Sequence, residues 1–325
     1  MSALKIYYDS IQEGHWFKRL HPKLDRAELH PFPSKASGHK TLSKVLAYDR
    51  PDIVLTDHDD PILVVERTVE VPSGHNVGQR FARLAAAAQV RVPCVYFGPY
   101  AAYKHGGSTQ GPRYMNLRLF YAIQKMAKIE RTASTTVNWP VDKNYEIIKA
   151  AQKDTRMRAY MDLFFENYRQ GELGKLNAIL ESSQFEQEQE TERLVFIANE
   201  VENPEQYDIP PPSVTIMPTA NFKTEYRITS DQLPLNNTVV YNVGMRYVRS
   251  DPYTGAAILY SYLYCGGMRK HSAHLILHFP NITRKTWNAA AKNQHRKDVR
   301  LFLAVADGII FGRHYAGIQS LRQPI

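Results

Sequence analysis

The hairpin pattern between residues 52 and 71 constrains the fold of this chain most strongly. Residues 52–56 and 62–71 are two runs rich in β-branched and other apolar side chains. The sequence His58-Asp59-Asp60-Pro61 separates them, and its Asp and Pro content is typical of a turn. The two runs therefore predict two neighbouring strands joined as a β-hairpin.

A helix and a third strand are predicted to follow the hairpin. Residues 76–90 carry apolar side chains at helical spacing, and residues 92–97 form a further apolar run. A helix between two strands favours a parallel crossover. We therefore expect the α/β class, with an α/β core over residues 1–140.

Acidic side chains in the hairpin indicate chemistry. Side chains alternate along a strand, so Glu66, Thr68 and Glu70 are expected to share one face. A glutamate in an otherwise apolar strand, close to a second carboxylate, is costly unless a cation neutralises the pair. Asp52 lies one strand away and can point at the same place as Glu66. Mg²⁺ binds one or two carboxylates together with phosphate and water oxygens, and it polarises a bound phosphate.

The residues Pro51-Asp52 and Glu66-Arg67-Thr68, on a hairpin followed by a helix and a strand, resemble the motif of the PD-(D/E)XK nuclease superfamily. The resemblance covers roughly residues 48–98. It implies a restriction-endonuclease-like mixed sheet with flanking helices. It also implies that Asp52 and Glu66 hold Mg²⁺, with Mn²⁺ as an alternative ion. The helix after the hairpin often carries a glutamine in these nucleases, and Gln79, Arg80 and Arg83 are the matching candidates for DNA contact.

The motif lysine of that superfamily is replaced by Thr68 in this chain. One reading is that another lysine reaches the site, with Lys40, Lys44 and Lys104 as candidates. A second reading is that Thr68 or Glu70 orients the water or a second ion. A third is a catalytically inactive site. We favour an active variant, in which Asp52, Glu66, Thr68 and Glu70 are the catalytic candidates.

The charge distribution points to a polyanionic partner. Residues 61–140 carry 10 Lys and Arg against 3 Asp and Glu, and residues 211–325 carry 14 against 5. Basic blocks of this kind bind nucleic acid by neutralising phosphates. Lys104, in the Tyr103-Lys104-His105-Gly106-Gly107 segment, is a candidate for backbone contact, although a plain surface loop is an equal alternative. Arg246 and Arg249 are further candidates for contact with double-stranded DNA.

Two further regions follow the expected core. Residues 141–209 are acidic and helical, with 15 Asp and Glu against 8 Lys and Arg in residues 141–210. An apolar stripe of five side chains in residues 157–165 is expected to be core. Residues 213–325 are expected to form a basic, DNA-contacting α/β region, with strands at 238–248 and 274–279, a helix at 251–264, and one or two strands within 301–311.

Several protein classes are disfavoured. The chain lacks a run of ~20 apolar residues and a signal-peptide pattern, so we expect no membrane partner. Cys94 and Cys265 are its two cysteines, which fits a reducing cytoplasm and argues against a disulfide framework. The 12 histidines have no zinc-ligand spacing, and no Gly-x-Ser-x-Gly elbow is present.

The leading expectation is a Mg²⁺-dependent DNA endonuclease of the restriction or phage-defence type, acting as a homodimer on two-fold DNA sites. A second hypothesis is a non-catalytic DNA- or RNA-binding module with a degenerate site. A third is a protein-assembly component that binds its partner through the acidic helical segment, around residues 181–205.

Overall fold

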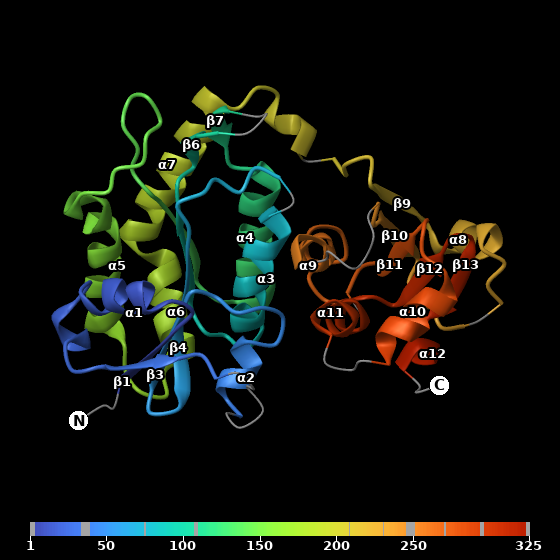
Figure 1. The fold of residues 1–325 in the computed structure, drawn as a ribbon, viewed down its shortest axis with the longest axis horizontal. Coiled ribbons are helices and arrows are strands. Elements are labelled where there is room, and N and C mark those ends of the chain that lie inside the picture. Colours follow the sequence, from blue (N-terminus) through green and yellow to red (C-terminus); the bar gives the residue numbers. More distant parts are fainter. Residues whose placement is uncertain are drawn as a thin grey trace. The chain divides into compact units, whose positions relative to one another are not determined.

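The computed structural model describes residues 4–33, 40–74, 76–106, 110–207, 209–229, 231–244, 251–269, 271–292 and 296–322. The chain divides into two compact units. The first comprises Met1–Gly74 and Arg83–Pro204, and the second comprises His75–Ala82 and Glu205–Ile325. Both units are α/β, and the first contains the predicted hairpin (Figure 1).

The first unit is built on a mixed six-stranded sheet with the order β2-β1-β3-β4-β5-β8. Its strands are β1 (Leu4–Tyr8), β2 (Glu28–Pro31), β3 (Ile53–Asp57), β4 (Asp60–Arg67), β5 (Cys94–Gly98) and β8 (Ser134–Asn138). Strands β3 and β4 are antiparallel, whereas β4, β5 and β8 run parallel. A small antiparallel hairpin, β6 (Ala101–Lys104) with β7 (Gly111–Tyr114), follows β5.

The β3–β4 hairpin forms where the sequence predicts it. The turn residue His58 has a φ of 55°, a left-handed conformation that closes the tight connection. Ile53 pairs with Val65 and Val54 with Val64, so successive side chains alternate between the two faces of the sheet. Every residue of β3 is buried, which makes this hairpin the centre of the unit.

Helices cover both faces of this sheet (Figure 1). The helices of the unit are α1 (Ile11–Lys18), α2 (Leu42–Val45), α3 (Asn76–Gln89), α4 (Leu117–Glu130), α5 (Thr155–Asn167), α6 (Leu173–Ser182) and α7 (Gln184–Glu200). Side chains of α1, α5 and α6 pack with one face, around Ile53 and Val65. The predicted core stripe on α5 is confirmed, because Met157, Phe164 and the other members are buried there.

The acidic segment packs on the sheet as part of the first unit as far as Pro204. One face of α7 is buried through Gln189, Arg193 and Phe196. Near its start, the Glu186 carboxylate accepts a hydrogen bond of 2.6 Å from the Thr135 hydroxyl of β8. The pKa of Glu186 is raised to about 7, chiefly by burial, and the Thr135 hydrogen bond acts in the opposite direction. One acid of this segment, Glu186, is therefore a buried group of the fold and does not belong to an exposed acidic surface.

The second unit contains a five-stranded sheet with the order β13-β12-β11-β10-β9. Its elements are β9 (Val214–Pro218), α8 (Thr219–Glu225), β10 (Asn237–Asn242), α9 (Asp251–Tyr264), β11 (His274–Phe279), α10 (Arg284–Ala291), α11 (Lys297–Val305), β12 (Gly308–Phe311), β13 (His314–Gly317) and α12 (Ile318–Arg322). The three central strands β10, β11 and β12 are parallel, and the two edge strands are antiparallel to them. The helical crossovers that join the central strands are the usual solution for parallel pairs.

The first residues of α3 belong to this second unit. A Cβ atom built on Gly78 of α3 would meet the backbone of Gly255 and Ala256 in α9, and one built on Gly255 would meet Gly78. Two glycines thus allow the two helix backbones to approach closely. Phe81 completes the contact with a T-shaped ring pair to Tyr262 at 5.2 Å.

Two of the strand boundaries predicted from sequence are wrong. The strand expected over residues 62–71 ends at Arg67, because the Thr68 hydroxyl bonds the backbone of Glu70 and turns the chain. The strand expected over 238–248 ends at Asn242. The strand expected within residues 301–311 is confirmed as β12, and helix α11 occupies the residues before it.

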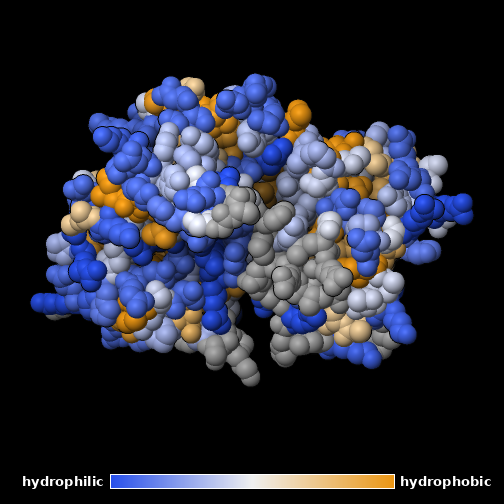
Figure 2. Space-filling view, turned by 45° about the horizontal axis from the view of Figure 1, so that its top comes forward, coloured by the Kyte–Doolittle hydropathy of each residue, from blue (hydrophilic) through white to orange (hydrophobic). Residues whose placement is uncertain are grey.

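The surface is mostly polar on the face drawn in Figure 2, where hydrophobic residues form small groups among hydrophilic ones. Among the helices of the described ranges, none is both long and apolar enough to cross a bilayer.

We predict that Glu186→Gln removes a pH-dependent loss of stability. The folded protein holds the Glu186 proton up to about pH 7, whereas an unfolded chain releases it near pH ~4.3. The free energy of unfolding should therefore fall as the pH rises through this window, by about 3 kcal/mol. In thermal melts, Glu186→Gln should have a higher melting temperature than the wild type at pH 8, and the two proteins should melt at about the same temperature at pH 5. Glu188→Gln, at an exposed position of α7, is the matched control. Equal pH slopes in all three proteins would contradict the prediction.

Candidate functional site

Asp52 and Glu66 lie on the same face of the hairpin, at the end where β3 begins and β4 finishes. Asp52 is 5% exposed and Glu66 is fully buried. The Arg67 backbone N–H donates to Asp52 Oδ2 at 2.6 Å, which fixes that carboxylate against the neighbouring strand. The strand pairing of Ile53 with Val65 places both acids on the opposite side from this apolar pair. The structure thus brings together the two side chains expected to bind metal.

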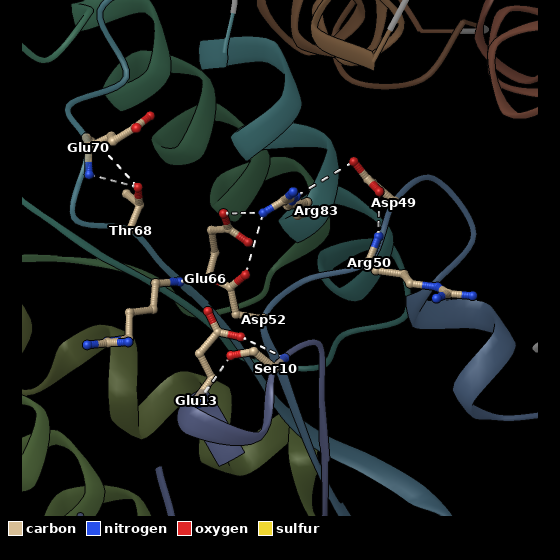
Figure 3. A network of polar contacts seen from close by, with 10 residues as sticks. Ser10, Glu13, Asp49, Arg50, Asp52, Glu66, Thr68, Glu70 and Arg83 are labelled. Carbon is tan, nitrogen blue, oxygen red and sulfur yellow. Dashed lines mark hydrogen bonds and ion pairs between the residues drawn. The ribbon is translucent and has the colours of Figure 1, made fainter. Parts of the chain in front are cut away.

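Arg83 of α3 joins the two carboxylates (Figure 3). Its Nη1 atom lies 2.9 Å from Glu66 Oε1 and 3.5 Å from Asp52 Oδ1. The sum of these two distances, 6.4 Å, is an upper limit for the separation of the two oxygens. One shared Mg²⁺, with ligand bonds of about 2.1 Å, requires them to lie within about 4.2 Å of each other. The Nε atom of Arg83 also lies 3.6 Å from Asp49 Oδ2. Arg83 was expected to contact DNA, and here its side chain is turned onto the acids.

Two acids at this site, Glu13 and Asp49, were missed by sequence reasoning. Glu13 comes from α1, where it forms a capping box: Ser10 accepts from the Glu13 N–H, and Glu13 Oε2 accepts from the Ser10 N–H at 3.0 Å. Figure 3 shows Glu13 beside Asp52. The Ser-x-x-Glu spacing predicts the capping box from sequence alone. Nothing local in the sequence places that helix start against the hairpin.

The site carries an excess of negative charge. Burial raises the pKa of Asp52 to about 8, and the charges of Glu66 and Glu13 add to this effect. The Arg67 N–H and the Arg83 guanidinium act in the opposite direction. Burial alone would lower the pKa of Arg83, but Glu66, Asp49 and Asp52 outweigh it and raise that pKa. One guanidinium is therefore too little positive charge to keep both buried acids ionised at neutral pH.

The donor set fits a hard divalent cation. Two buried carboxylates already point at one positively charged nitrogen, and their oxygens are the ligands that Mg²⁺ prefers. Within the described ranges, no three Asp, Glu, His or Cys side chains converge as a complete metal cage. An ion held by Asp52 and Glu66 would therefore keep coordination positions for water and phosphate, which is typical of Mg²⁺ sites.

Thr68 and Glu70 do not join the carboxylate pair. The Thr68 hydroxyl is buried and accepts from the Glu70 N–H at 3.0 Å. The Glu70 side chain is exposed and points away from Glu66 (Figure 3). The alternation that would have aligned it with Glu66 ends with the strand at Arg67.

The remaining predicted residues are spread over the chain. Gln79 and Arg80 are partly buried in the half of α3 that belongs to the second unit. Lys104 is exposed at the end of β6. Arg246 and Arg249 lie outside the described residues. The alternative lysines, Lys40 and Lys44, are exposed, whereas Arg83 is a cation that contacts both Asp52 and Glu66.

We predict that Mg²⁺ and Arg83 stabilise the same pair of acids. Arg83→Gln leaves two buried carboxylates without their guanidinium and should lower the free energy of unfolding by about 3 kcal/mol or more. Mg²⁺ should then raise the melting temperature of Arg83→Gln more than that of the wild type, because the ion takes over the neutralisation. Lys128→Gln, at an exposed position of α4, should behave like the wild type. A Mg²⁺ effect equal in all three proteins, or none in any of them, would argue against a cation site here.

Comparisons of the chain with protein-family models, with curated proteins and with solved structures found no match.

Proposed function

We propose that this chain is a metal-dependent endodeoxyribonuclease that hydrolyses phosphodiester bonds with Mg²⁺, or Mn²⁺, held by Asp52 and Glu66. One observation carries the proposal: two buried carboxylates from neighbouring strands point at a single cationic nitrogen. Burying two carboxylates side by side costs free energy, so a functional role for the pair is a reason for its presence. A cation-dependent reaction on a phosphate is a use that fits these ligands.

The connectivity around the acids supports the proposal. An antiparallel hairpin carrying Asp52 and Glu66 is followed by helix α3 and by β5, which runs parallel to β4. This order is the one that the resemblance to the PD-(D/E)XK superfamily implies, and we include the restriction-endonuclease-like fold in the proposal. The proposed function is inferred from the site residues, because one fold can host many functions. The topology is consistent with that function but does not by itself indicate it.

The residues of the chain have distinct parts in the proposed reaction. The metal ion, when bound, polarises the phosphate and lowers the pKa of a bound water. Asp52 must give up its proton before it can bind the ion, since its pKa is raised to about 8 by burial and by Glu66. Arg83 supplies the positive charge that the missing lysine supplies in the superfamily, and its planar guanidinium can donate to phosphate oxygens.

DNA is the proposed substrate because of the charge distribution. Residues 61–140, which contain Glu66 and Arg83, carry 10 Lys and Arg against 3 Asp and Glu. Gln79, Arg80 and Lys104 are the proposed backbone contacts in this block. A restriction or phage-defence role, and a homodimer that cuts both strands, belong to the same proposal.

A second candidate function is a non-catalytic nucleic-acid-binding module. The observation in its favour is the Arg83 ion pair itself, 2.9 Å from Glu66, which neutralises the acid without any metal. Thr68 in place of the motif lysine points in the same direction.

Cleavage of supercoiled plasmid DNA separates the two candidates. With Mg²⁺, the wild type should nick or linearise the plasmid, and Asp52→Asn or Glu66→Gln should lower the rate by about 100-fold or more, because a metal ligand is lost. Glu70→Gln is the matched control, since its side chain points away from the pair, and it should keep wild-type activity. DNA binding, measured by fluorescence anisotropy in Ca²⁺, should be retained in all variants. Cleavage that persists in the presence of a chelator, or in Asp52→Asn, would contradict the proposal. DNA binding without cleavage with any metal would favour the non-catalytic nucleic-acid-binding module.

We also predict a coupling between pH and Mg²⁺. At subsaturating Mg²⁺ the cleavage rate should rise as the pH increases towards about 8, because the Asp52 carboxyl must lose its proton to bind the ion. Saturating Mg²⁺ should shift this rise to lower pH, since the ion competes with the proton. Initial rates across pH 6–9 at several Mg²⁺ concentrations measure the effect. A pH profile that does not move with Mg²⁺ would contradict the role given to Asp52.

A further inference from the structure

Arg67 lies next to Glu66 in sequence, but its side chain is on the opposite face of the sheet. Its guanidinium carbon is 4.7 Å from the ring centroid of Trp16 and 4.8 Å from that of Trp139. The ring of Phe97 stacks with both indoles, at 5.8 Å and 4.7 Å. The guanidinium is therefore held in one position by the faces of two tryptophans.

The Arg67 guanidinium has hydrogen-bond donors that the described part of the protein does not use. In the part of the chain that the structure describes, the Arg67 guanidinium makes no hydrogen bond or ion pair, and its Nε is buried without an acceptor. Burial lowers the pKa of Arg67, against the charges of Glu13, Asp154 and Asp52. Contacts with aromatic faces offset part of the cost of burying the charge, but they do not satisfy the buried Nε donor. A fixed guanidinium with open donors is suited to an anion.

Arg67 forms one wall of a pocket of about 540 Å³ within the first unit. Lys149 and Lys153 add positive charge, and Trp139, Ile147 and Tyr103 add apolar and aromatic walls. The volume lies in the range of small-molecule sites, roughly 300–1,000 Å³. The pocket is thus cationic at one part of its wall and apolar at another.

Two other charged residues of the pocket, Lys153 and Glu146, each have an ionisable neighbour. Lys153 lies 3.0 Å from Asp154, and His105 lies 2.9 Å from Glu146. Lys149 is exposed and, among the described residues, has no hydrogen bond or ion pair. The uncompensated positive charge of the pocket therefore comes from Arg67 and Lys149.

We propose that this pocket binds a nucleotide, with its phosphate on Arg67 and Lys149 and its nucleoside against Tyr103, Ile147 and Trp139. The planar guanidinium matches the geometry of a phosphate, and the apolar walls match a base and sugar. The ligand is either the phosphorylated end of a nucleic-acid strand or a free nucleotide. The site is separate from the Asp52–Glu66 pair, because Arg67 and Glu66 face opposite sides of the sheet, and it requires no metal.

Intrinsic fluorescence can report on this pocket directly. The chain has three tryptophans, and two of them, Trp16 and Trp139, flank Arg67. In the presence of EDTA, thymidine 5′-monophosphate should change the emission in a saturable way, and thymidine without phosphate should not. Equal responses to both compounds, or no response to millimolar thymidine 5′-monophosphate, would overturn the proposal.

Two variants and one control locate the ligand. Arg67→Gln should weaken thymidine 5′-monophosphate binding at least about tenfold, since it removes the charged fork. Lys149→Ala should weaken it about threefold and, as a surface change, leaves the core intact. Lys143→Ala, at an exposed position of the same loop region and outside the pocket lining, should bind like the wild type. Binding that is unchanged in Lys149→Ala and in a folded Arg67→Gln would contradict the assignment.

The source of the phosphate is settled by competition. A short single strand with a 5′-phosphate or a 3′-phosphate that displaces the mononucleotide better than its hydroxyl-ended counterpart identifies a strand end. Displacement by free nucleotides alone identifies a soluble ligand. Because these titrations contain EDTA and no cleavage is scored, their outcome is independent of nuclease activity. Asp52→Asn should bind the mononucleotide normally even where it abolishes cleavage.

Discussion

The ion cluster of Arg83 with Asp52 and Glu66 is the interaction on which the rest of the first unit depends. Two carboxylates are buried on one face of a mixed sheet, where an unpaired charge would cost several kcal/mol. Arg83 offsets this cost at 2.9 Å from Glu66, and it thereby fixes where α3 lies against the hairpin. The Arg67 N–H fixes Asp52 from the neighbouring strand. The cluster is therefore both the electrostatic centre of the unit and the joint between hairpin and helix.

The same cluster is short of positive charge, which is the physical link between fold and proposed function. Glu13 and Asp49 surround the pair with further negative charge, and Asp52 holds its proton to about pH 8 because of burial and the Glu66 charge. A divalent ion would relieve this imbalance more completely than one guanidinium does. Arg67, on the other face of the same strand end, shows the opposite imbalance, with a buried Nε donor that has no acceptor among the described residues. Two sites of opposite charge at one strand end fit a protein that handles phosphate groups.

The parts of the fold that depend on local periodicity could be predicted from sequence. The hairpin, the helix over residues 76–89 and the stripe on α5 follow from patterns of two or 3.6 residues, and strand parity placed Asp52 and Glu66 on one face. Three features could not be predicted from periodicity, because other interactions determine them. The Thr68 hydroxyl competes for the backbone of Glu70 and ends the strand early. The first residues of the 301–311 run have apolar spacing compatible with either element. Arg83 lies on a helix whose inward face could be predicted only for apolar side chains.

Site residues contributed by distant segments were beyond sequence reasoning. Strand β2 and helix α2 separate Glu13 from Asp52 in the chain. The capping pattern of Glu13 predicts only its local role at the start of α1. Arg67 occupies the variable position of the metal-binding motif, so the motif gives no reason to single it out. Its environment arises from Trp16 and Trp139, which are far apart in the chain and meet only in the folded sheet.

Anomalous diffraction from crystals soaked in Mn²⁺ tests the central claim most directly. If the two acids form a metal centre, an anomalous peak should lie between Asp52 and Glu66, with carboxylate oxygens at about 2.1–2.2 Å from the ion and with Arg83 displaced from its bridging position. Crystals that show Arg83 still bridging both acids, with no manganese beside them at millimolar concentration, would contradict it.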